Sequence, residues 1–438
     1  MKKITIIGTG YVGLVTGAGL SDFGNDVTCV DISKKKIQAL KNGIIPIFEP
    51  GLEELVSKNF SNGRLSFSSN IPKSIESSEV VFIAVGTPER SDGKANLNAI
   101  KSVSKIIGEN ISDYLVVCTK STVPIGTSSM IINEINIQNV NNINFDYVSN
   151  PEFLREGSAV KDFLWPDRVI IGAQNEKAFE IMRNIYRPLY VNEKPIMHTN
   201  IETAEMIKYS ANAFLALKIS YINEVANLCE KVGADIHQVA KGMGQDGRIS
   251  SKFLHPGPGF GGSCFPKDTK AFSMLSKEYD LKMETIDAAI NVNKNQKRRM
   301  TEKLNKLLSF NIKDKTIAIL GLSFKPNTDD VRESPAIEII NFILDKGGSI
   351  NAYDPVANDA MSNVFEKINY SNSWKNACAD ADAVVIMTEW NEFRGIDLKI
   401  LKQTLNSPIV LDTRNIFSVE KLKRTGFIYD NVGRNNIK

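Results

Sequence analysis

The stretch Lys3-Ile-Thr-Ile-Ile-Gly8-Thr-Gly10-Tyr-Val-Gly13 decides the fold of the first part of this chain. Its apolar run, Ile4–Ile7, is typical of a buried strand and leads directly into glycines spaced Gly-x-Gly-x-x-Gly. The first glycine permits a tight turn, the second lets the backbone approach a pyrophosphate, and the third lets helix and strand pack closely. The pattern predicts a strand, a turn and a helix from Tyr11 to about Phe23, which together open a dinucleotide-binding fold.

A carboxylate stands where this fingerprint places its ribose acceptor. The second predicted strand, Val27–Val30, ends at Asp31, about 20 residues after the glycines. Asp31 would accept hydrogen bonds from ribose hydroxyls and repel a 2′-phosphate, so we expect NAD rather than NADP as the cofactor. Lys36 is a nearby base that could accept a phosphate, and it keeps NADP open as an alternative.

Strands and helices alternate through the rest of the first segment, and the alternation returns after about Phe310. The apolar runs of the first segment predict a parallel, doubly wound sheet; they are Val80–Val85, Leu115–Cys118, Tyr147–Ser149 and Val169–Ile171. The later segment repeats the order, with strands predicted at Thr316–Leu320, Ile350–Tyr353, Ala383–Met387 and Ile409–Leu411 and a helix at Pro335–Lys346. In this second copy Gly321-Leu-Ser-Phe-Lys325 replaces the phosphate-binding glycines, so we expect it to bind a different ligand or to bind the same one differently.

Between the two copies the pattern is helical. No Gly or Pro interrupts Glu202–Val232, and its apolar residues recur at helical spacing, which predicts one helix of about thirty residues. Shorter helical patterns follow around Ala234–Gly242 and Thr269–Tyr279. We therefore predict an α/β protein with two Rossmann-like doubly wound domains joined by a central helical domain, with boundaries at 1–200, 201–300 and 301–438.

The composition is typical of a globular protein and excludes several classes of partner. Lys and Arg number 53 against 50 Asp and Glu, without a basic cluster, so nucleic acid is not expected as a partner. No signal peptide follows Met1 and no apolar stretch approaches the roughly 20 residues of a membrane span, so we expect a cytoplasmic location and no membrane partner. The cysteines and histidines lack metal-ligand spacing, so no metal site is expected.

The most unusual stretch is Pro256-Gly-Pro-Gly-Phe-Gly-Gly-Ser-Cys264-Phe-Pro-Lys-Asp268. Glycines and prolines around a cysteine predict an open loop with an accessible thiol, and Lys267 nearby would favour the nucleophilic thiolate. The alternative is a turn that merely contains a cysteine. The other cysteines, at positions 29, 118, 229 and 378, fall in strand-like or helix-like runs and are expected to be buried.

Two further groups of polar residues suggest a reactive site. Glu205, Lys208 and Asn212 are spaced three and four apart on the long predicted helix, so they share one face, and a lysine beside an amide can stabilise an oxyanion. Asn150-Pro-Glu152 follows a strand at the carboxyl edge of the first sheet, where ligands bind in such folds and where a carboxylate can act as a general base. The plainer alternatives are a solvated helix face and a capping or surface acid.

Together these residues resemble the UDP-glucose 6-dehydrogenases, within the UDP-glucose/GDP-mannose dehydrogenase superfamily. The resemblance covers essentially the whole chain. Its motifs, in order, are Gly8–Gly13, Lys120–Gly126, Asn150–Gly157, Trp165–Gly172, Lys208–Asn212, Gly259–Asp268, Phe324-Lys325 with Arg332–Pro335, and Asp412-Thr-Arg414. It implies a four-electron oxidation of UDP-glucose to UDP-glucuronate by two NAD, through a bound aldehyde and through a thiohemiacetal and a thioester on Cys264.

The resemblance also implies roles for single residues. Cys264 is the nucleophile, Lys208 and Asn212 stabilise the oxyanion, Glu152 is the base that activates water with the help of Thr122, and Asp268 supports the charge state of the site. The residues that we assign to cofactor binding are Gly8, Gly10, Tyr11, Val12, Gly13, Asp31, Lys36, Thr87, Thr122, Glu156 and Arg332. Those that we assign to the substrate are Glu152, Phe153, Leu154, Lys208, Asn212, Arg248, Phe253, Gly261, Lys325 and Arg414. Arg248 matches an arginine that reaches the sugar nucleotide of a neighbouring subunit, which implies a homodimer.

Other activities stay open at this point. GDP-mannose 6-dehydrogenase and UDP-N-acetylhexosamine 6-dehydrogenase would use the same chemistry, although Trp165–Val169 and Phe260–Asp268 resemble the UDP-glucose branch best. A two-electron β-hydroxyacid dehydrogenase would share the N-terminal fingerprint and a Lys-xxx-Asn helix, but it needs neither Cys264 nor a third domain. A non-enzymatic NAD sensor would have no reason to hold Cys264, Lys208 and Glu152 together.

Overall fold

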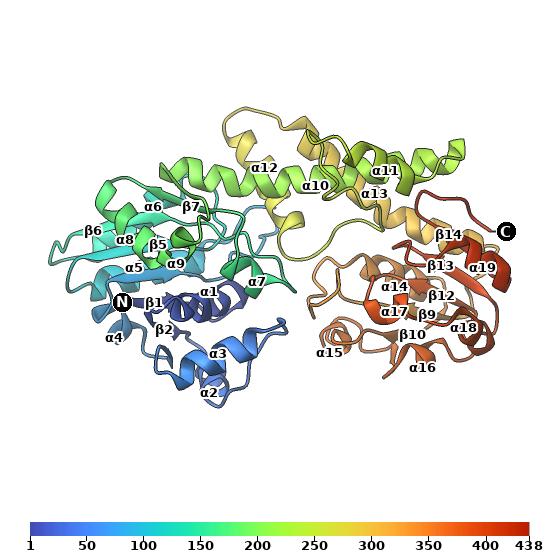
Figure 1. Cartoon of the computed structure of the whole chain (residues 1–438), viewed down its shortest axis with the longest axis horizontal. Helices are drawn as coiled ribbons and strands as arrows, with labels where there is room; N and C mark the ends of the chain where they lie inside the picture. Colours follow the sequence, from blue (N-terminus) through green and yellow to red (C-terminus); the bar gives the residue numbers. More distant parts are fainter. Residues whose placement is uncertain (438) are drawn as a thin grey trace. The chain divides into compact units, whose positions relative to one another are not determined.

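The computed structural model describes residues 1–437. Their contacts divide the chain into two compact units, Met1–Ala211 and Asn212–Lys438, and the boundary falls inside one long helix, α10 (Ile201–Val232). Each unit contains one sheet with helices on both of its faces (Figure 1). The predicted fold class is therefore confirmed, including the long central helix. The division into three domains at 200 and 300 stays a prediction.

The first unit holds an eight-stranded sheet in the order β3-β2-β1-β4-β5-β6-β7-β8. Its strands are β1 (Lys3–Ile7), β2 (Asp26–Val30), β3 (Leu65–Ser68), β4 (Val80–Ile83), β5 (Leu115–Thr119), β6 (Phe145–Ser149), β7 (Val169–Ala173) and β8 (Ile196–Thr199). The prediction of an entirely parallel sheet is wrong at one place, because β7 runs antiparallel to β6. The segment between them begins at the carboxyl end of β6 and enters β7 at the same edge, without crossing back over the sheet.

Helices cover both faces of this sheet. They are α1 (Tyr11–Asp22), α2 (Lys34–Lys41), α3 (Leu52–Ser61), α4 (Ile71–Glu76), α5 (Asn98–Asn110), α6 (Thr127–Gln138), α7 (Ala159–Leu164), α8 (Glu176–Ile185) and α9 (Arg187–Val191). Successive strand residues point to opposite faces, so Val80 and Phe82 join the core under α1, α3 and α8, while Val81 and Ile83 join the core under α5 and α6.

The second unit repeats this plan with six parallel strands in the order β11-β10-β9-β12-β13-β14. The strands are β9 (Thr316–Leu320), β10 (Ser349–Tyr353), β11 (Asn369–Tyr370), β12 (Ala383–Ile386), β13 (Ile409–Asp412) and β14 (Ile428–Asn431). Helices after β9 are α14 (Pro335–Asp345), α15 (Asn358–Ser362), α16 (Trp374–Cys378), α17 (Asn391–Arg394), α18 (Leu398–Thr404) and α19 (Val419–Thr425). The order matches that of the first six strands of the chain, which confirms the predicted internal repeat.

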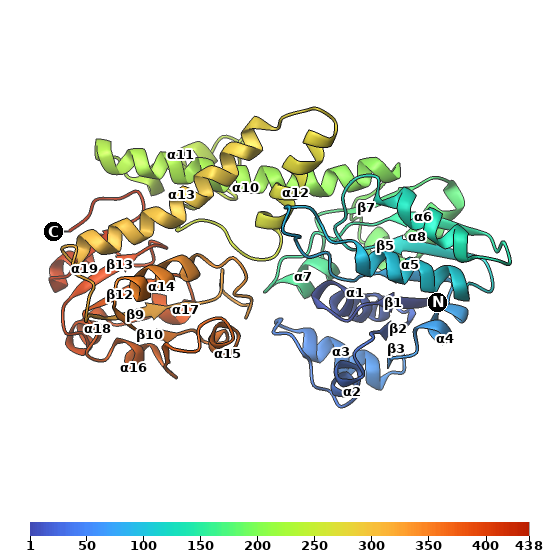
Figure 2. The ribbon, with the colours of Figure 1, turned by 180° about the vertical axis from the view of Figure 1, so that it is seen from behind.

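Helices α11 (Ile236–Gly244), α12 (Phe265–Glu278) and α13 (Glu284–Leu307) precede the second sheet. The C-terminal half of α10 lies along α13 (Figure 2). Among the contacts between them, the Ser220 hydroxyl donates to the Ala289 carbonyl at 2.8 Å, and Arg299 pairs with Glu230 at 2.6 Å. Helix α13 buries polar as well as apolar residues, so its apolar pattern in the sequence is weak. Within residues 1–437, no helix is both long and apolar enough to span a membrane.

Candidate active site

The glycine turn between β1 and α1 has the shape of a pyrophosphate cradle. Gly8 has a φ of +106°, and a Cβ there would lie 2.6 Å from the Ala84 carbonyl oxygen. A Cβ at Gly13 would lie 1.9 Å from the Gly8 carbonyl oxygen, whereas a Cβ at Gly10 would meet nothing within 4 Å. Gly8 and Gly13 are therefore required by packing, and Gly10 faces open space. Helix α1 begins here without a side-chain cap, so the first-turn N–H groups of Tyr11 and Val12 are available to an anion.

Asp31 lies at the end of β2 and already orients this turn. One of its carboxylate oxygens accepts from the Thr9 N–H at 3.0 Å and the Thr9 hydroxyl at 2.8 Å, and the other accepts from the Ser33 N–H at 2.9 Å. Partial burial alone would raise the pKa of Asp31, but these hydrogen bonds, aided by the charge of exposed Lys36, hold it below its usual value. Asp31 therefore stays a carboxylate, as a ribose acceptor must.

Glu49 is a residue near the cofactor turn that the sequence did not reveal. Its carboxylate accepts from the Tyr11 hydroxyl at 2.9 Å and from the Gly157 and Ala159 N–H groups at 2.7 Å each. It thus ties α1 to the loop that contains the predicted cofactor residue Glu156. Burial raises the pKa of Glu49 above its usual value. No spacing in the sequence marks it, since its partners are two distant segments.

Two other residues assigned to the cofactor are also in contact. The Thr87 hydroxyl donates to the Thr122 carbonyl at 2.9 Å, so the loops that follow β4 and β5 are joined at the carboxyl edge of the sheet. This is the edge at which ligands bind in doubly wound folds.

A buried ion pair lies at the same edge. Lys208, from α10, donates to Glu152 Oε1 at 3.0 Å, and the Glu152 carboxylate also accepts from the Leu154 N–H. Lys208 is 3% and Glu152 5% exposed, so neither is on a solvated surface, and the plainer alternatives of a solvated helix face and a surface acid are wrong for this pair. Phe153 lies beside the pair, with Lys208 Nζ 5.3 Å from its ring centroid. The structure therefore brings four predicted site residues together.

A second lysine, Lys120, is buried nearby at the end of β5. Its ammonium donates to Asn150 Oδ1 at 3.0 Å and to the Tyr186 hydroxyl at 3.2 Å. Burial lowers the pKa of Lys120 to about 8. The motif that contains Lys120 was noted in the sequence, but its partner Tyr186 lies on a different part of the chain.

Three further predicted catalytic residues, Asn212, Cys264 and Asp268, lie in the second unit. Asn212 Nδ2 donates to Asp268 Oδ2 at 2.7 Å, and both side chains are buried. The Asp268 N–H donates to the Cys264 carbonyl at 2.8 Å, which is the first hydrogen bond of α12. Cys264 is the N-terminal cap residue of this helix and is half-buried. A helix N-terminus favours negative charge, so this position suits a thiolate.

One expectation about the cysteine loop needs correction. The loop is not open, because residues 256–262 are all buried, and only Ser263 and Cys264 are partly exposed. The Lys267 ammonium pairs with Asp268 Oδ1 at 2.5 Å, and its effect on the thiol stays a prediction. The four other cysteines are buried, as predicted.

Two of the residues assigned to the substrate, Lys325 and Arg414, lie in the second unit, after the carboxyl ends of β9 and β13. Arg414 donates to the Met387 carbonyl at 2.8 Å and to the Phe324 carbonyl at 3.0 Å, and Lys325 lies over the Phe324 ring at 5.1 Å. The hydrogen bonds fix the Arg414 guanidinium, and the ring contact orients the Lys325 ammonium. Arg332 forms a two-bonded pair with Asp330, at 2.8 and 2.7 Å.

Arg248 and Phe253 precede the cysteine loop. Arg248 is exposed and pairs with Asp246 at 2.6 Å. Phe253 has a φ of +64°, and its ring meets that of Phe265 edge-on at 6.2 Å. Their roles stay predictions.

The comparisons with known proteins decide the family. Residues 2–190, 202–295 and 318–419 match, in order, the NAD binding domain, the central domain and the UDP binding domain of the UDP-glucose/GDP-mannose dehydrogenase family. The chain belongs to this family. It is 48% identical over 438 residues to the UDP-glucose 6-dehydrogenase of Rhizobium meliloti (strain 1021), covering 99% of each chain. It is 46% identical over 435 residues to UDP-glucose 6-dehydrogenase TuaD of Bacillus subtilis (strain 168), covering 99% of this chain and 94% of the relative.

Solved structures agree. A UDP-glucose dehydrogenase from the archaeon Pyrobaculum islandicum superposes with a TM-score of 0.93 at 34% identity, covering 99% of this chain and 98% of that one. The cradle and Asp31 thus lie in a family domain that binds NAD, and the cofactor of this dehydrogenase is NAD. When bound, NAD supplies the oxidant by accepting hydride.

Glu205 is a buried carboxyl group of α10 that holds a loop of the NAD binding domain. Its Oε2 accepts from the Gly126 N–H at 3.0 Å, at the start of α6, while Oε1 is buried without a hydrogen-bond partner. Glu205 is 3% exposed, and burial raises its pKa to about 7. Folded protein therefore binds more protons here than unfolded protein between about pH 4.5 and 7. Stability contributed by this group falls as the pH rises through that window.

We expect Glu205→Gln to gain stability relative to the wild type as the pH rises. The advantage should grow by about 2–3 kcal/mol between pH 5 and pH 8, since one pKa unit corresponds to 1.36 kcal/mol. Chemical denaturation at both pH values measures it, and Glu224→Gln, at an exposed position of α10, is the control. An advantage of equal size at the two pH values would contradict the assignment of a raised pKa.

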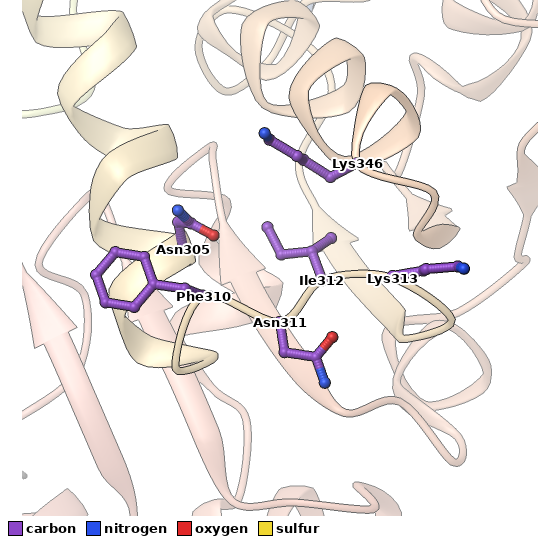
Figure 3. A pocket seen from close by; sticks show the side chains of 6 residues that line it. All are labelled: Asn305, Phe310, Asn311, Ile312, Lys313 and Lys346. Carbon is purple, nitrogen blue, oxygen red and sulfur yellow. The ribbon is translucent and has the colours of Figure 1, made fainter.

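A surface hollow of about 410 Å³ lies between the end of α13 and the end of α14 (Figure 3). Its lining residues are Asn305, Phe310, Asn311, Ile312, Lys313 and Lys346. It includes no predicted site residue and its lysines are exposed, so we assign it no function. In the part of the chain that the structure describes, no group of three or more His, Cys, Asp or Glu side chains could hold a metal ion.

Proposed function

We propose that this dehydrogenase oxidises UDP-glucose to UDP-glucuronate through a covalent intermediate on Cys264. The observation that carries the proposal is on helix α10: Lys208 and Asn212 lie one turn apart, and each is held by a buried carboxylate. Asp268, the partner of Asn212, is one helical turn from Cys264. When an aldehyde is oxidised through a covalent intermediate, a thiol serves as the nucleophile, and an ammonium and an amide donor stabilise the oxyanion. The relatives named above support the choice of substrate.

The first oxidation converts the primary alcohol at C6 into an aldehyde. The hydroxyl loses its proton and the carbon loses a hydride, and the ammonium of Lys208 stabilises the alkoxide that develops. Because Lys208 and Glu152 are already paired in a buried environment, the positive charge is oriented before substrate arrives. Such preorganised charge acts more strongly than the same charge in water.

The second oxidation passes through sulfur. The Cys264 thiolate adds to the aldehyde carbon, and the oxyanion that forms accepts hydrogen bonds from Lys208 and Asn212. A second hydride then leaves this thiohemiacetal and a thioester remains. Water attacks the thioester, Glu152 takes its proton, and the C–S bond breaks to release the carboxylate and restore the thiolate. In sum, one alcohol, two NAD and one water give one carboxylate, two NADH and three protons.

The second unit holds groups suited to a nucleotide diphosphate. Its Rossmann-like sheet has lost the phosphate-binding glycines, but it retains Lys325 and Arg414, both oriented by contacts within the unit. Arginine and lysine side chains bind phosphate in place of a helix N-terminus. The match of residues 318–419 to a UDP binding domain supports this assignment.

The substrate assignment is tested with a panel of sugar nucleotides. We expect UDP-glucose to give the highest kcat/KM, above GDP-mannose and UDP-N-acetylhexosamines, when NADH release is followed. A higher kcat/KM with GDP-mannose would move the assignment to that sister activity and leave the thioester mechanism unchanged.

The proposal includes a homodimer built on α10. Phe214, Tyr221 and Leu228 are spaced by seven residues on this helix, and they are 60%, 49% and 61% exposed. An exposed apolar stripe with this spacing is the pattern by which helices pair. We also propose that the enzyme acts in the cytoplasm, where its NAD is available and its free thiols stay reduced.

We expect the double variant Phe214→Glu/Leu228→Glu to be monomeric, because it places charge in the apolar stripe. Light scattering after size-exclusion chromatography measures the mass, and Lys231→Glu, at an exposed position of the same helix, is the control. If Arg248 serves a neighbouring subunit, the monomer should also have a raised KM for UDP-glucose. If the double variant is still a dimer, the interface does not lie on this stripe of α10.

A further inference from the structure

The glycine loop before Cys264 is held by three buried amide side chains, which we name the amide clamp: Asn223 of α10 and Asn293 and Gln296 of α13. At Gly257 the N–H donates to Asn223 Oδ1 and the carbonyl accepts from Gln296 Nε2, both at 2.8 Å. At Phe260 the N–H donates to Asn293 Oδ1 at 2.7 Å and the carbonyl accepts from Asn293 Nδ2 at 3.1 Å. The clamp therefore satisfies both polar groups of the backbone at two positions, much as a neighbouring strand would.

The clamp is itself rigidly placed. Asn223 is 0%, Gln296 1% and Asn293 6% exposed, so their hydrogen bonds are shielded from water. Gln296 Oε1 also accepts from Asn227 Nδ2 at 2.9 Å, which fixes the orientation of its amide. Asn293 and Gln296 are bonded at both ends of the amide, so displacing either one would cost two hydrogen bonds. Asn223 is bonded through Oδ1, and its Nδ2 is buried without a hydrogen-bond partner.

The loop is shaped to lie against the clamp. Gly259 has a φ of +108°, and a Cβ there would lie 2.8 Å from Asn293 Oδ1 and 3.2 Å from Lys297 Cγ. On its other edge, the Gly262 N–H donates to the Arg332 carbonyl at 2.8 Å, and a Cβ at Gly261 would lie 2.4 Å from the Glu333 carbonyl oxygen. A glycine-rich segment free in solution samples many conformations, so contacts on both edges are needed to select one.

We propose that Asn223, Asn293 and Gln296 are positioning residues for the reaction: they hold the loop in one conformation before ligand binds, and so place Gly261 for the sugar nucleotide and Cys264 for attack. The proposal rests on the proposed function in its assignment of Cys264 as nucleophile. Preorganisation of this kind raises the rate because the geometry of attack is already set in the free enzyme. The clamp residues do not themselves touch the reacting atoms.

The test compares Asn293→Ala with Asn295→Ala, a matched control at an exposed position of the same helix. Asn293→Ala leaves the Phe260 N–H without its acceptor, so hydrogen exchange in residues 257–262 should become faster by roughly tenfold to a hundredfold. Alkylation of Cys264 by iodoacetamide in ligand-free enzyme should also become faster. In steady state kcat/KM for UDP-glucose should fall at least about tenfold, with the KM for NAD unchanged, and the control should match the wild type in every measurement.

Two conservative variants keep the test valid if Asn293→Ala folds poorly. Asn293→Asp keeps the acceptor for the Phe260 N–H but loses the donor to the Phe260 carbonyl. Gln296→Glu keeps the acceptor for Asn227 but loses the donor to the Gly257 carbonyl. Both should show faster exchange in the loop and lower kcat/KM. Unchanged exchange in all three variants would overturn the clamp, and faster exchange with normal kcat/KM would overturn its positioning role. Full activity of Cys264→Ala would instead refute the proposed mechanism, and the exchange rates would still report on the clamp.

Discussion

Replacing Cys264 with alanine is expected to lower the rate of UDP-glucuronate formation by about a thousandfold or more, because the thiohemiacetal and the thioester cannot form without sulfur. Cys264 is half-buried and is the N-cap residue of α12, a position that favours the thiolate. The loss should appear in kcat. NAD binding should be unaffected, since the fingerprint glycines belong to a different unit of the chain.

The measurement follows acid and NADH formation together, and calorimetry gives the affinity for NAD. Cys229→Ala is the control, because Cys229 is a buried thiol on α10 without an assigned role. It should keep near-normal turnover. Turnover of Cys264→Ala within a few-fold of the wild type would end the covalent mechanism.

Lys208→Met should lower kcat by roughly a hundredfold to a thousandfold, the range observed when a donor to a developing oxyanion is removed. The lysine is bonded to Glu152 at 3.0 Å in a buried pair, so its removal also leaves a carboxylate without a cation. That loss should destabilise the protein by about 3–5 kcal/mol. Activity and stability must therefore be separated.

A double-mutant cycle with Glu152→Gln separates them. The double variant Lys208→Met/Glu152→Gln should regain much of the stability that Lys208→Met loses, because no charge stays buried, yet its kcat should remain low. Lys231→Met, at an exposed position in the last turn of α10, should behave as the wild type. Recovery of kcat along with stability would show that Lys208 is structural.

Much of the fold could be predicted because it follows local patterns. Glycine spacing, apolar runs and an uninterrupted helical stretch located β1, α1 and α10 to within a few residues. The antiparallel direction of β7 could not be read, since an apolar run has no direction and the connection before it decides which edge the chain enters. Helix α13 has no clear apolar pattern in the sequence, because it buries polar residues such as Asn293 and Gln296.

The site could be predicted where chemistry is concentrated in one motif. The contacts that hold it could not, because they join distant segments: Glu49 reaches Gly157, and Gln296 reaches Gly257. Amides and single acids on helices are common, and no spacing distinguishes those that hold a loop from those that face solvent.

Asp31 and Asp354 show how equivalent positions can differ. Both end the second strand of a Rossmann-like sheet. Asp31 accepts bonds from Thr9 and Ser33, whereas buried Asp354 is bonded to Leu322, Ser323, Val356, Ala357 and the Trp390 indole. With its oxygens so occupied, Asp354 does not suit a ribose acceptor, which accords with a second unit that binds a different ligand.

The most direct test of the account is the number of NADH molecules released for each UDP-glucose consumed under limiting substrate. The thioester route predicts two NADH, one UDP-glucuronate and no free aldehyde, since the aldehyde is captured by Cys264 before it can leave. One NADH for each sugar, or an aldehyde that an added trapping reagent removes in stoichiometric amounts, would contradict it.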